Sequence, residues 1–189
     1  MFREVTVRGM RIPFHINFPE VNLRFYVRHQ SGDEWKRGVV FIKEIVPKPA
    51  ISFVANTFFG ERYITLPMKY QWQTEDENWK IGYQWKFRGR WNKIEAVTAQ
   101  ETFSLVAGSE EEFITQHFWG YTAMKNGKAA EYHVKHPEWD LYPVKTYGID
   151  CDFAGLYGNQ FAFLANSKPG SFFLAEGSPI QVFHKRIIV

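Results

Sequence analysis

Residues 19–68 read PEVNLRFYVRHQSGDEWKRGVVFIKEIVPKPAISFVANTFFGERYITLPM, and this stretch decides the fold. Near its start, Asn22, Arg24 and Tyr26 alternate with Leu23 and Phe25. A period of two residues predicts a strand with one polar and one apolar side. An arginine on an aromatic-rich strand needs water or an anionic partner, so the pattern makes Arg24 a candidate ligand-binding residue. The structural alternative is that Arg24 pairs with an acid on the outside of the sheet.

The composition favours a sheet-rich protein. Of the 189 residues, 45% are hydrophobic and 18% are aromatic, and the aromatic fraction is the unusual one. Aromatic rings pack well on pleated surfaces, and they also line ligand cavities. The length is that of one domain, so residues 1–189 are predicted to form a single domain.

Charge and cysteine content narrow the classes of function. The net charge of +3 comes from scattered residues, which predicts no nucleic-acid partner. The single cysteine, Cys151, excludes an internal disulfide and fits a reducing compartment. No stretch approaches the roughly twenty apolar residues of a membrane span, and the N-terminus lacks the apolar core of a signal peptide. We therefore expect a soluble, cytoplasmic protein without a membrane partner.

Turn residues divide the chain into many short strands and one or two helices. A Ser109 cap followed by three glutamates predicts a short helix ending near Gly120. Residues 50–59 have helical spacing but are also rich in β-branched residues, which leaves helix or strand open. The predicted strands are Glu4–Arg8, Val21–His29, Gly38–Val46, Ile51–Ala55, Ile64–Trp72, Trp79–Arg88, Asn92–Thr98, Ala129–Val134, Lys145–Ile149, Phe161–Ala165, Ser171–Leu174 and Ile180–Ile188.

Several segments resemble the YqjF-like proteins, an uncharacterised conserved bacterial family (domain of unknown function 2071). They are PEVNLRFYVRH, KRGVVFIKEIVPKPAI, ANTFFGERY followed by LPM, SEEEFITQHFWGYT and VKHPEWDLY. That family is similar to the acetoacetate-decarboxylase-like superfamily. The resemblance implies a mainly β (α+β) fold, an antiparallel β-barrel around an apolar cavity, with one or two short helices.

The resemblance does not extend to the decarboxylase chemistry. Decarboxylases of that superfamily form a Schiff base through a lysine pair that follows a conserved glycine. With Gly60 as the matching glycine, the pair would fall on Tyr63 and Ile64, which carry no amine. The nearest following lysine is Lys69. We therefore expect no Schiff base at this position.

Family members usually carry some tens of residues before the counterpart of VRGMRIPFHINFPEVN. The resemblance therefore implies that an N-terminal portion of the barrel is missing here. A barrel without one strand would have an open edge. Self-association into a homo-oligomer through that edge is an expectation that follows.

Four further residues are candidates for a ligand-binding site. Glu44 lies within VVFIKEIV, where alternation would place it on one apolar face with Val40, and a carboxylate there is either paired or lines a cavity. If Glu44 is buried, a raised pKa would suit it for acid–base chemistry. The alternative is a salt bridge to Arg24 or another cation. The other candidates are Asn56, Glu61 and Tyr63, which lie near the position of the decarboxylase lysines. The alternatives are that Tyr63 only fills the mouth of the cavity and that Glu61 is an exposed turn residue.

No sequence motif predicts a metal or a cofactor. His133 and His136 are three residues apart in a segment that reads as extended, where such residues point to opposite faces. No glycine-rich phosphate loop and no Gly-x-Ser-x-Gly element is present. We therefore predict binding of a small anionic organic molecule in an aromatic-lined cavity. The alternative is an enzyme that acts on a small carbonyl or carboxylate compound by acid–base chemistry, and the sequence alone assigns no catalytic residue.

Overall fold

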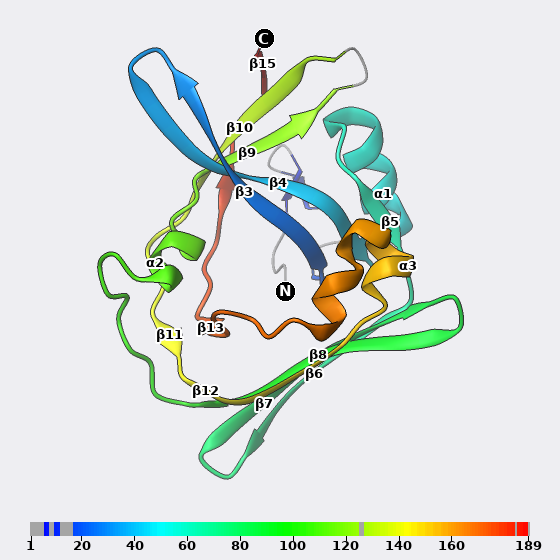
Figure 1. Cartoon of the computed structure of the whole chain (residues 1–189), viewed down its shortest axis with the longest axis vertical. Coiled ribbons are helices and arrows are strands. Elements are labelled where there is room, and N and C mark those ends of the chain that lie inside the picture. Colours follow the sequence, from blue (N-terminus) through cyan, green and yellow to red (C-terminus); the bar gives the residue numbers. More distant parts are fainter. Residues whose placement is uncertain (1–5, 8–9, 12–16, 125–126, 184, 189) are drawn as a thin grey trace. The chain divides into compact units, whose positions relative to one another are not determined.

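The computed structural model describes residues 6–7, 10–11, 17–124, 127–183 and 185–188 (Figure 1). The described chain is mainly β, with a few short helices. It divides into two compact units, each made of separate stretches of chain. The first unit contains Met1–Thr65, Gln116–Glu138 and Ser178–Val189, and the second contains Leu66–Thr115 and Trp139–Gly177. Whether both units belong to one domain stays a prediction.

The first unit is built on a long hairpin. Strands β3 (Val21–Ser31) and β4 (Glu34–Val46) pair antiparallel, and Gly32 turns the chain between them in the left-handed region at φ 64°. On its other edge, β4 pairs in parallel with β9 (Trp119–Ala123) near its start and with β5 (Tyr63–Thr65) at its end. The end of β4 therefore has a neighbouring strand on each side.

Three more strands complete this sheet. β10 (Ala129–Lys135) pairs antiparallel with β9. It also pairs antiparallel with β14 (Gln181–Val182) and β15 (Arg186–Ile188). The rings of Tyr121 and Tyr132 lie against Gly38 and Gly120, where they leave no room for a side chain. The unit also contains a two-stranded pair, β1 (Thr6–Val7) with β2 (Met10–Arg11). Its buried apolar side chains are Phe18, Val39, Ile45, Val46, Tyr121 and Ala130.

A bulge in the hairpin changes which residues of β4 share a face. Leu23 pairs with Lys43, but Arg24 pairs with Phe41, so Ile42 is an extra residue on β4. Glu44 lies opposite Asn22 on one face, whereas Val40 lies opposite Phe25 on the other. The expectation that Val40 shares an apolar face with Glu44 is therefore wrong, because one inserted residue reverses the alternation.

Helix α1 (Pro49–Val54) connects β4 to β5 and continues into the π-helical turn η1 (Ala55–Phe59). The turn ends at Gly60, whose φ of 71° suits a glycine. The Ser52 and Thr65 hydroxyls lie 2.8 Å apart and link α1 to β5. The ambiguous segment 50–59 is thus helical, and the alternative strand Ile51–Ala55 is wrong.

The second unit contains an antiparallel sheet in the order β12–β8–β7–β6 (Figure 1). Its strands are β6 (Met68–Glu75), β7 (Asn78–Phe87), β8 (Arg90–Ala99) and β12 (Val144–Asp150). The predicted hairpin between β7 and β8 is confirmed, with Arg88 and Gly89 both at positive φ as a two-residue turn requires. The unit also pairs β11 (Leu141–Tyr142) with β13 (Leu174–Ala175). Among the described strands, neither large sheet pairs its two outer strands, so the barrel stays a prediction.

Three helical segments belong to the second unit. α2 (Glu110–Thr115) begins after Ser109, whose Oγ accepts a hydrogen bond from the Glu112 amide at 3.1 Å. It ends earlier than the predicted Gly120, because Trp119 and Gly120 pair with β4. α3 (Phe153–Tyr157) is capped by Asp152. The predicted strand Phe161–Ala165 is wrong: it lies within the 3₁₀ helix η2 (Asn159–Asn166), since a short apolar run fits either state.

Candidate functional site

A row of three polar side chains crosses the end of the long hairpin. Glu44 on β4 pairs with Asn22 on β3 and with Tyr63 on β5. Paired residues on neighbouring strands project from the same face of a sheet, so these three side chains lie side by side. This row has two causes. The alternation of β3 places Asn22 beside Glu44, and the largely helical segment 47–62 returns the chain so that Tyr63 on β5 also pairs with Glu44.

Glu20, just before β3, joins the row through two hydrogen bonds. The Asn22 side-chain amide donates to Glu20 Oε1 at 3.0 Å, and the Tyr63 hydroxyl donates to Glu20 Oε2 at 3.0 Å. Glu20 is two residues before Asn22 in an extended segment, which places it on the same face. The Tyr63 hydroxyl is thereby held at the carboxyl group of Glu20.

The backbone around Tyr63 is fixed by Asn56. The Asn56 side-chain amide donates to the Tyr63 carbonyl at 2.8 Å, and its Oδ1 accepts from the Tyr63 amide at 2.8 Å. Nearby, the Thr122 hydroxyl donates to the Gly60 carbonyl at 3.0 Å. Asn56 thus positions Tyr63, and its direct contact with a ligand stays a prediction.

Replacing Asn56 with alanine is expected to destabilise the protein by about 1–2 kcal/mol, because the backbone of Tyr63 loses both hydrogen bonds. Denaturant unfolding measures this loss, and hydrogen exchange of the Tyr63 amide should become faster. Thr57→Ala, on the same exposed turn, is the matched control and should change stability by less than about 0.5 kcal/mol. Equal effects of the two substitutions would show that Asn56 does not hold Tyr63.

Glu44 is the most buried residue of a group that also contains Glu20, Glu61, Tyr63 and Tyr132, and this group is called the carboxyl cluster. Its relative exposure is 3%, and its Oε2 is buried without a hydrogen-bond partner among the residues that the structure describes. Buried carboxyl oxygens are normally hydrogen-bonded or paired with a cation. This oxygen is therefore an exception to the usual pairing of buried carboxyl groups.

The three carboxyl groups of Glu20, Glu44 and Glu61 all have raised pKa values. Burial, with the nearby charges of Glu20 and Glu61, raises the pKa of Glu44 to about 9. Burial also raises the pKa of Glu61 to about 7, although Lys185 acts in the opposite direction. Burial raises the pKa of Glu20 as well. At neutral pH the cluster therefore holds fewer than three negative charges.

The two tyrosines of the cluster are kept in the neutral form. Burial and the charges of Glu20 and Glu44 raise the pKa of Tyr63. Burial and the charges of Glu61 and Glu44 raise the pKa of Tyr132, whose ring lies against Gly120. Tyr63 can therefore act as a hydrogen-bond donor at physiological pH.

Two cations lie around the cluster. Arg24 is exposed, its guanidinium lies 5.7 Å from the centre of the Tyr26 ring, and its charge acts on Glu20 and Tyr132. The Lys185 amine lies 5.9 Å from the centre of the Phe59 ring, and its charge acts on Glu61. The structure shows no ion pair between Arg24 and Glu44 among the described residues.

Of the five predicted site residues, the structure places Glu44, Glu61 and Tyr63 in the cluster. Asn56 binds the backbone of Tyr63, and Arg24 is exposed beside the cluster. The sequence reasoning missed Glu20, Tyr132 and Lys185. Glu20 could have been found, because the alternation of Asn22 and Arg24 extends back to it. Tyr132 and Lys185 come from distant strands, and no local pattern indicates their approach.

The two histidines considered as metal ligands, His133 and His136, lie against aromatic rings. The His133 ring lies 4.9 Å from the Trp119 ring and 5.3 Å from the Phe183 ring, between centroids. The His136 ring lies 5.0 Å from that of Phe118. Within the described residues, no group of three or more histidine, cysteine, aspartate or glutamate side chains is arranged to hold a metal ion. None of the described helices has the length and apolar character needed to cross a membrane.

These features define a mainly β protein with a partly buried cluster of carboxyl and phenol groups. The model of the DUF2071 family, described as an uncharacterized conserved protein, matches residues 1–179, and the chain belongs to this family. No curated protein matches the chain.

Proposed function

We propose that Glu44 and its neighbours transfer protons to and from a small carbonyl or carboxylate compound. The observation that carries this proposal is the buried, unpartnered Oε2 of Glu44 within a cluster of carboxyl groups. A carboxyl group in this state can donate a hydrogen bond to a substrate oxygen and then pass on its proton. The cluster thereby supports the acid–base alternative more than simple anion binding.

The different pKa values suit the carboxyl groups to different roles. With a pKa of about 9, Glu44 keeps its proton at neutral pH and can serve as a general acid. With a pKa of about 7, Glu61 is present in both forms and can accept or return a proton. Tyr63, held at Glu20, supplies a further neutral donor. No lysine is required for this chemistry.

The proposal includes an antiparallel barrel of the acetoacetate-decarboxylase-like kind, with the carboxyl cluster lining its cavity. The long antiparallel hairpin of β3 and β4 in the first unit supports this architecture. We also expect a cytoplasmic location and self-association through an open strand edge.

Deuterium exchange tests the proton-transfer step without knowledge of the final product. The parent protein is incubated in D₂O with pyruvate, acetoacetate and butanedione, and the loss of α-proton signals is followed by NMR. We expect accelerated exchange for at least one compound. Glu44→Gln keeps the size of the side chain but cannot transfer the proton, and it should slow the catalysed exchange by about 100-fold.

Glu34→Gln is the matched control, because Glu34 is an exposed glutamate at the start of the same strand. Its exchange rate should equal that of the parent protein. The proposal is wrong if the parent accelerates exchange of none of the three compounds, or if Glu34→Gln and Glu44→Gln have equal effects.

A second candidate function is binding of a small anion without turnover. The exposed Arg24 guanidinium favours it, because its charge reaches Glu20 and Tyr132 of the cluster. Saturable binding of a carboxylate without any exchange, weakened by Arg24→Met, would select this function over proton transfer.

A further inference from the structure

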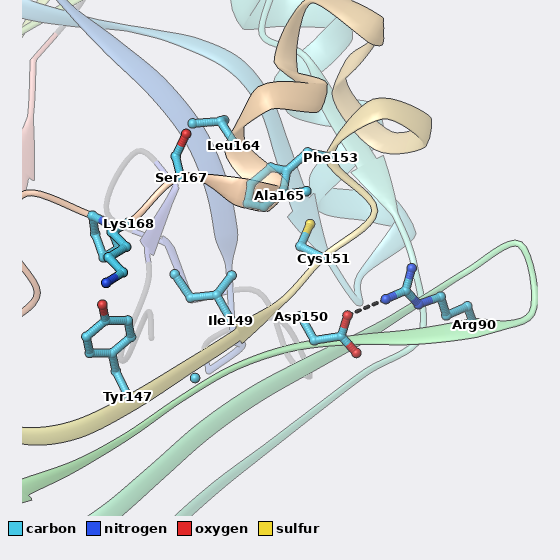
Figure 2. A pocket seen from close by; sticks show the side chains of 12 residues that line it. Arg90, Tyr147, Ile149, Asp150, Cys151, Phe153, Leu164, Ala165, Ser167 and Lys168 are labelled. Carbon is cyan, nitrogen blue, oxygen red and sulfur yellow. Dashed lines mark hydrogen bonds and ion pairs between the residues drawn. The ribbon is translucent and has the colours of Figure 1, made fainter.

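A surface pocket of about 380 Å³ lies in the second unit, and its lining includes none of the residues of the carboxyl cluster (Figure 2). It is bounded by the end of β12 and by the helical segments α3 and η2, with the residues that follow η2. Its volume is at the lower end of the range of about 300–1,000 Å³ for ligand pockets. The size suits a small organic molecule.

One end of the pocket carries hydrogen-bond donors. Figure 2 shows the Lys168 amine and the Tyr147 hydroxyl pointing toward one another. The Tyr147 ring stacks on Phe172 with a centroid distance of 4.5 Å and an interplanar angle of 12°, which fixes the position of its hydroxyl. An ammonium and a phenol at one end of a pocket can both donate to the same carboxylate.

The charges of the lining residues leave one positive charge uncompensated. Arg90 and Asp150 form an ion pair, marked by the dashed line in Figure 2. None of the ion pairs found among the described residues includes Lys168. Burial raises the pKa of the Cys151 thiol to about 12, so it is uncharged at neutral pH. The pocket therefore favours a ligand with a single negative charge.

Part of the remaining wall is apolar. Ile149 is 42% exposed on β12, and Phe153, Leu164 and Ala165 of the helical segments also line the pocket (Figure 2). An aliphatic chain that covers these side chains removes apolar surface from water on both sides. The pocket thus combines an anion-binding end with a surface for a short hydrocarbon tail.

We propose that this pocket binds a small monocarboxylate with an aliphatic tail. The carboxylate lies between Lys168 and Tyr147, and the tail covers Ile149, Leu164 and Phe153. This site shares no residue with the carboxyl cluster, and the proposal does not depend on proton transfer there.

The test compares hexanoate with hexanamide, which has the same tail without the charge. Both are titrated into the isotope-labelled 189-residue protein at pH 7, and amide chemical shifts give the affinity and the location of binding. We expect hexanoate to bind at least fivefold more tightly than hexanamide. The shifts should concentrate on residues 147–151 and 164–169.

Four substitutions test the charge, the tail and the location of the site. Lys168→Met should weaken hexanoate binding at least fivefold and leave hexanamide binding unchanged, whereas Lys145→Met, an exposed lysine of β12 that does not line the pocket, should change neither. Ile149→Thr should weaken hexanoate binding more than acetate binding. Glu44→Gln should leave hexanoate binding intact.

Several results would overturn the proposal. One is equal affinity for hexanoate and hexanamide in the parent protein. Another is the same loss of hexanoate binding in Lys168→Met and Lys145→Met. Shifts confined to residues outside the pocket, or a loss of hexanoate binding in Glu44→Gln, would place the carboxylate elsewhere.

Discussion

Replacing Glu44 with glutamine is expected to make the protein more stable at alkaline pH and to flatten the dependence of its stability on pH. Glutamine resembles a protonated glutamate in size and can donate a hydrogen bond, but it never ionises. Near pH 5 the two proteins should therefore have similar free energies of unfolding. By pH 8 or above, Glu44→Gln should be more stable by on the order of 4 kcal/mol.

The sign of this effect follows from proton binding. Glu44 has a pKa of about 9 in the folded protein and an ordinary value of 4.5. Between these values the folded chain holds a proton that the unfolded chain releases, so a rise in pH favours unfolding. The stabilising contribution is complete below about pH 4.5 and is lost as the pH rises toward 9. Glu61, with a pKa of about 7, contributes a smaller loss of stability, which ends near pH 7.

Denaturant unfolding from pH 5 to pH 9 measures the effect. Glu34→Gln, at an exposed position on the same strand, is the control and should follow the parent profile. A parent profile that rises between pH 5 and pH 8, with the same rise in Glu44→Gln, would show that Glu44 is not protonated in the folded protein.

The second large effect is expected at Glu131, which is fully buried on β10. Its carboxylate accepts from the Lys36 amine at 3.1 Å and also pairs with Arg186 Nε. Burial alone would raise the pKa of Glu131, but the hydrogen bonds from Lys36 and Arg186 outweigh burial and lower it. The group is therefore charged at neutral pH. Glu131→Ala should cost about 3–5 kcal/mol, because Lys36 is mostly buried and loses its partner.

A double substitution separates the cost of leaving the Lys36 charge unpaired from the cost of losing the contact with Glu131. Glu131→Met leaves the Lys36 charge without its partner, whereas Glu131→Met combined with Lys36→Met removes both charges and keeps much of the volume. The double variant should regain at least 1 kcal/mol relative to Glu131→Met. Glu95→Gln, which breaks an exposed pair with Lys93, should cost less than about 1 kcal/mol. Equal losses for Glu131→Ala and Glu95→Gln would contradict this account.

Local patterns predicted the long strands, such as β3 and β7, because each face of a half-buried strand follows a period of two. The alternation around Arg24 and the turn at Arg88 and Gly89 are both visible in the sequence, and the structure confirms both elements. The register of β3 against β4 was not predictable in the same way. The extra residue at Ile42 leaves no composition signal, yet it decides which side of the sheet Val40 occupies.

The candidate site could be predicted only where it lies on neighbouring segments. Glu44 stood out as a carboxylate in an apolar run, and Glu61 and Tyr63 followed from their position after Gly60. Their meeting depends on the parallel pairing of β4 with β5, which a single sequence does not specify. Tyr132 and Lys185 reach the cluster from β10 and from the C-terminal segment, so they required the three-dimensional structure.

The parallel pairing of β4 with β5 has a consequence for how this family can vary. Residues 47–62 leave the sheet at Val46 and return to place Tyr63 beside Glu44. Removing one residue from this excursion would bring Ile64 to that place, and adding one would bring Arg62. Many side chains of residues 47–62 are exposed, but the number of residues in this segment decides which side chain lies beside Glu44. Insertions and deletions between 47 and 62 should therefore be rarer among functional relatives than changes of residue type.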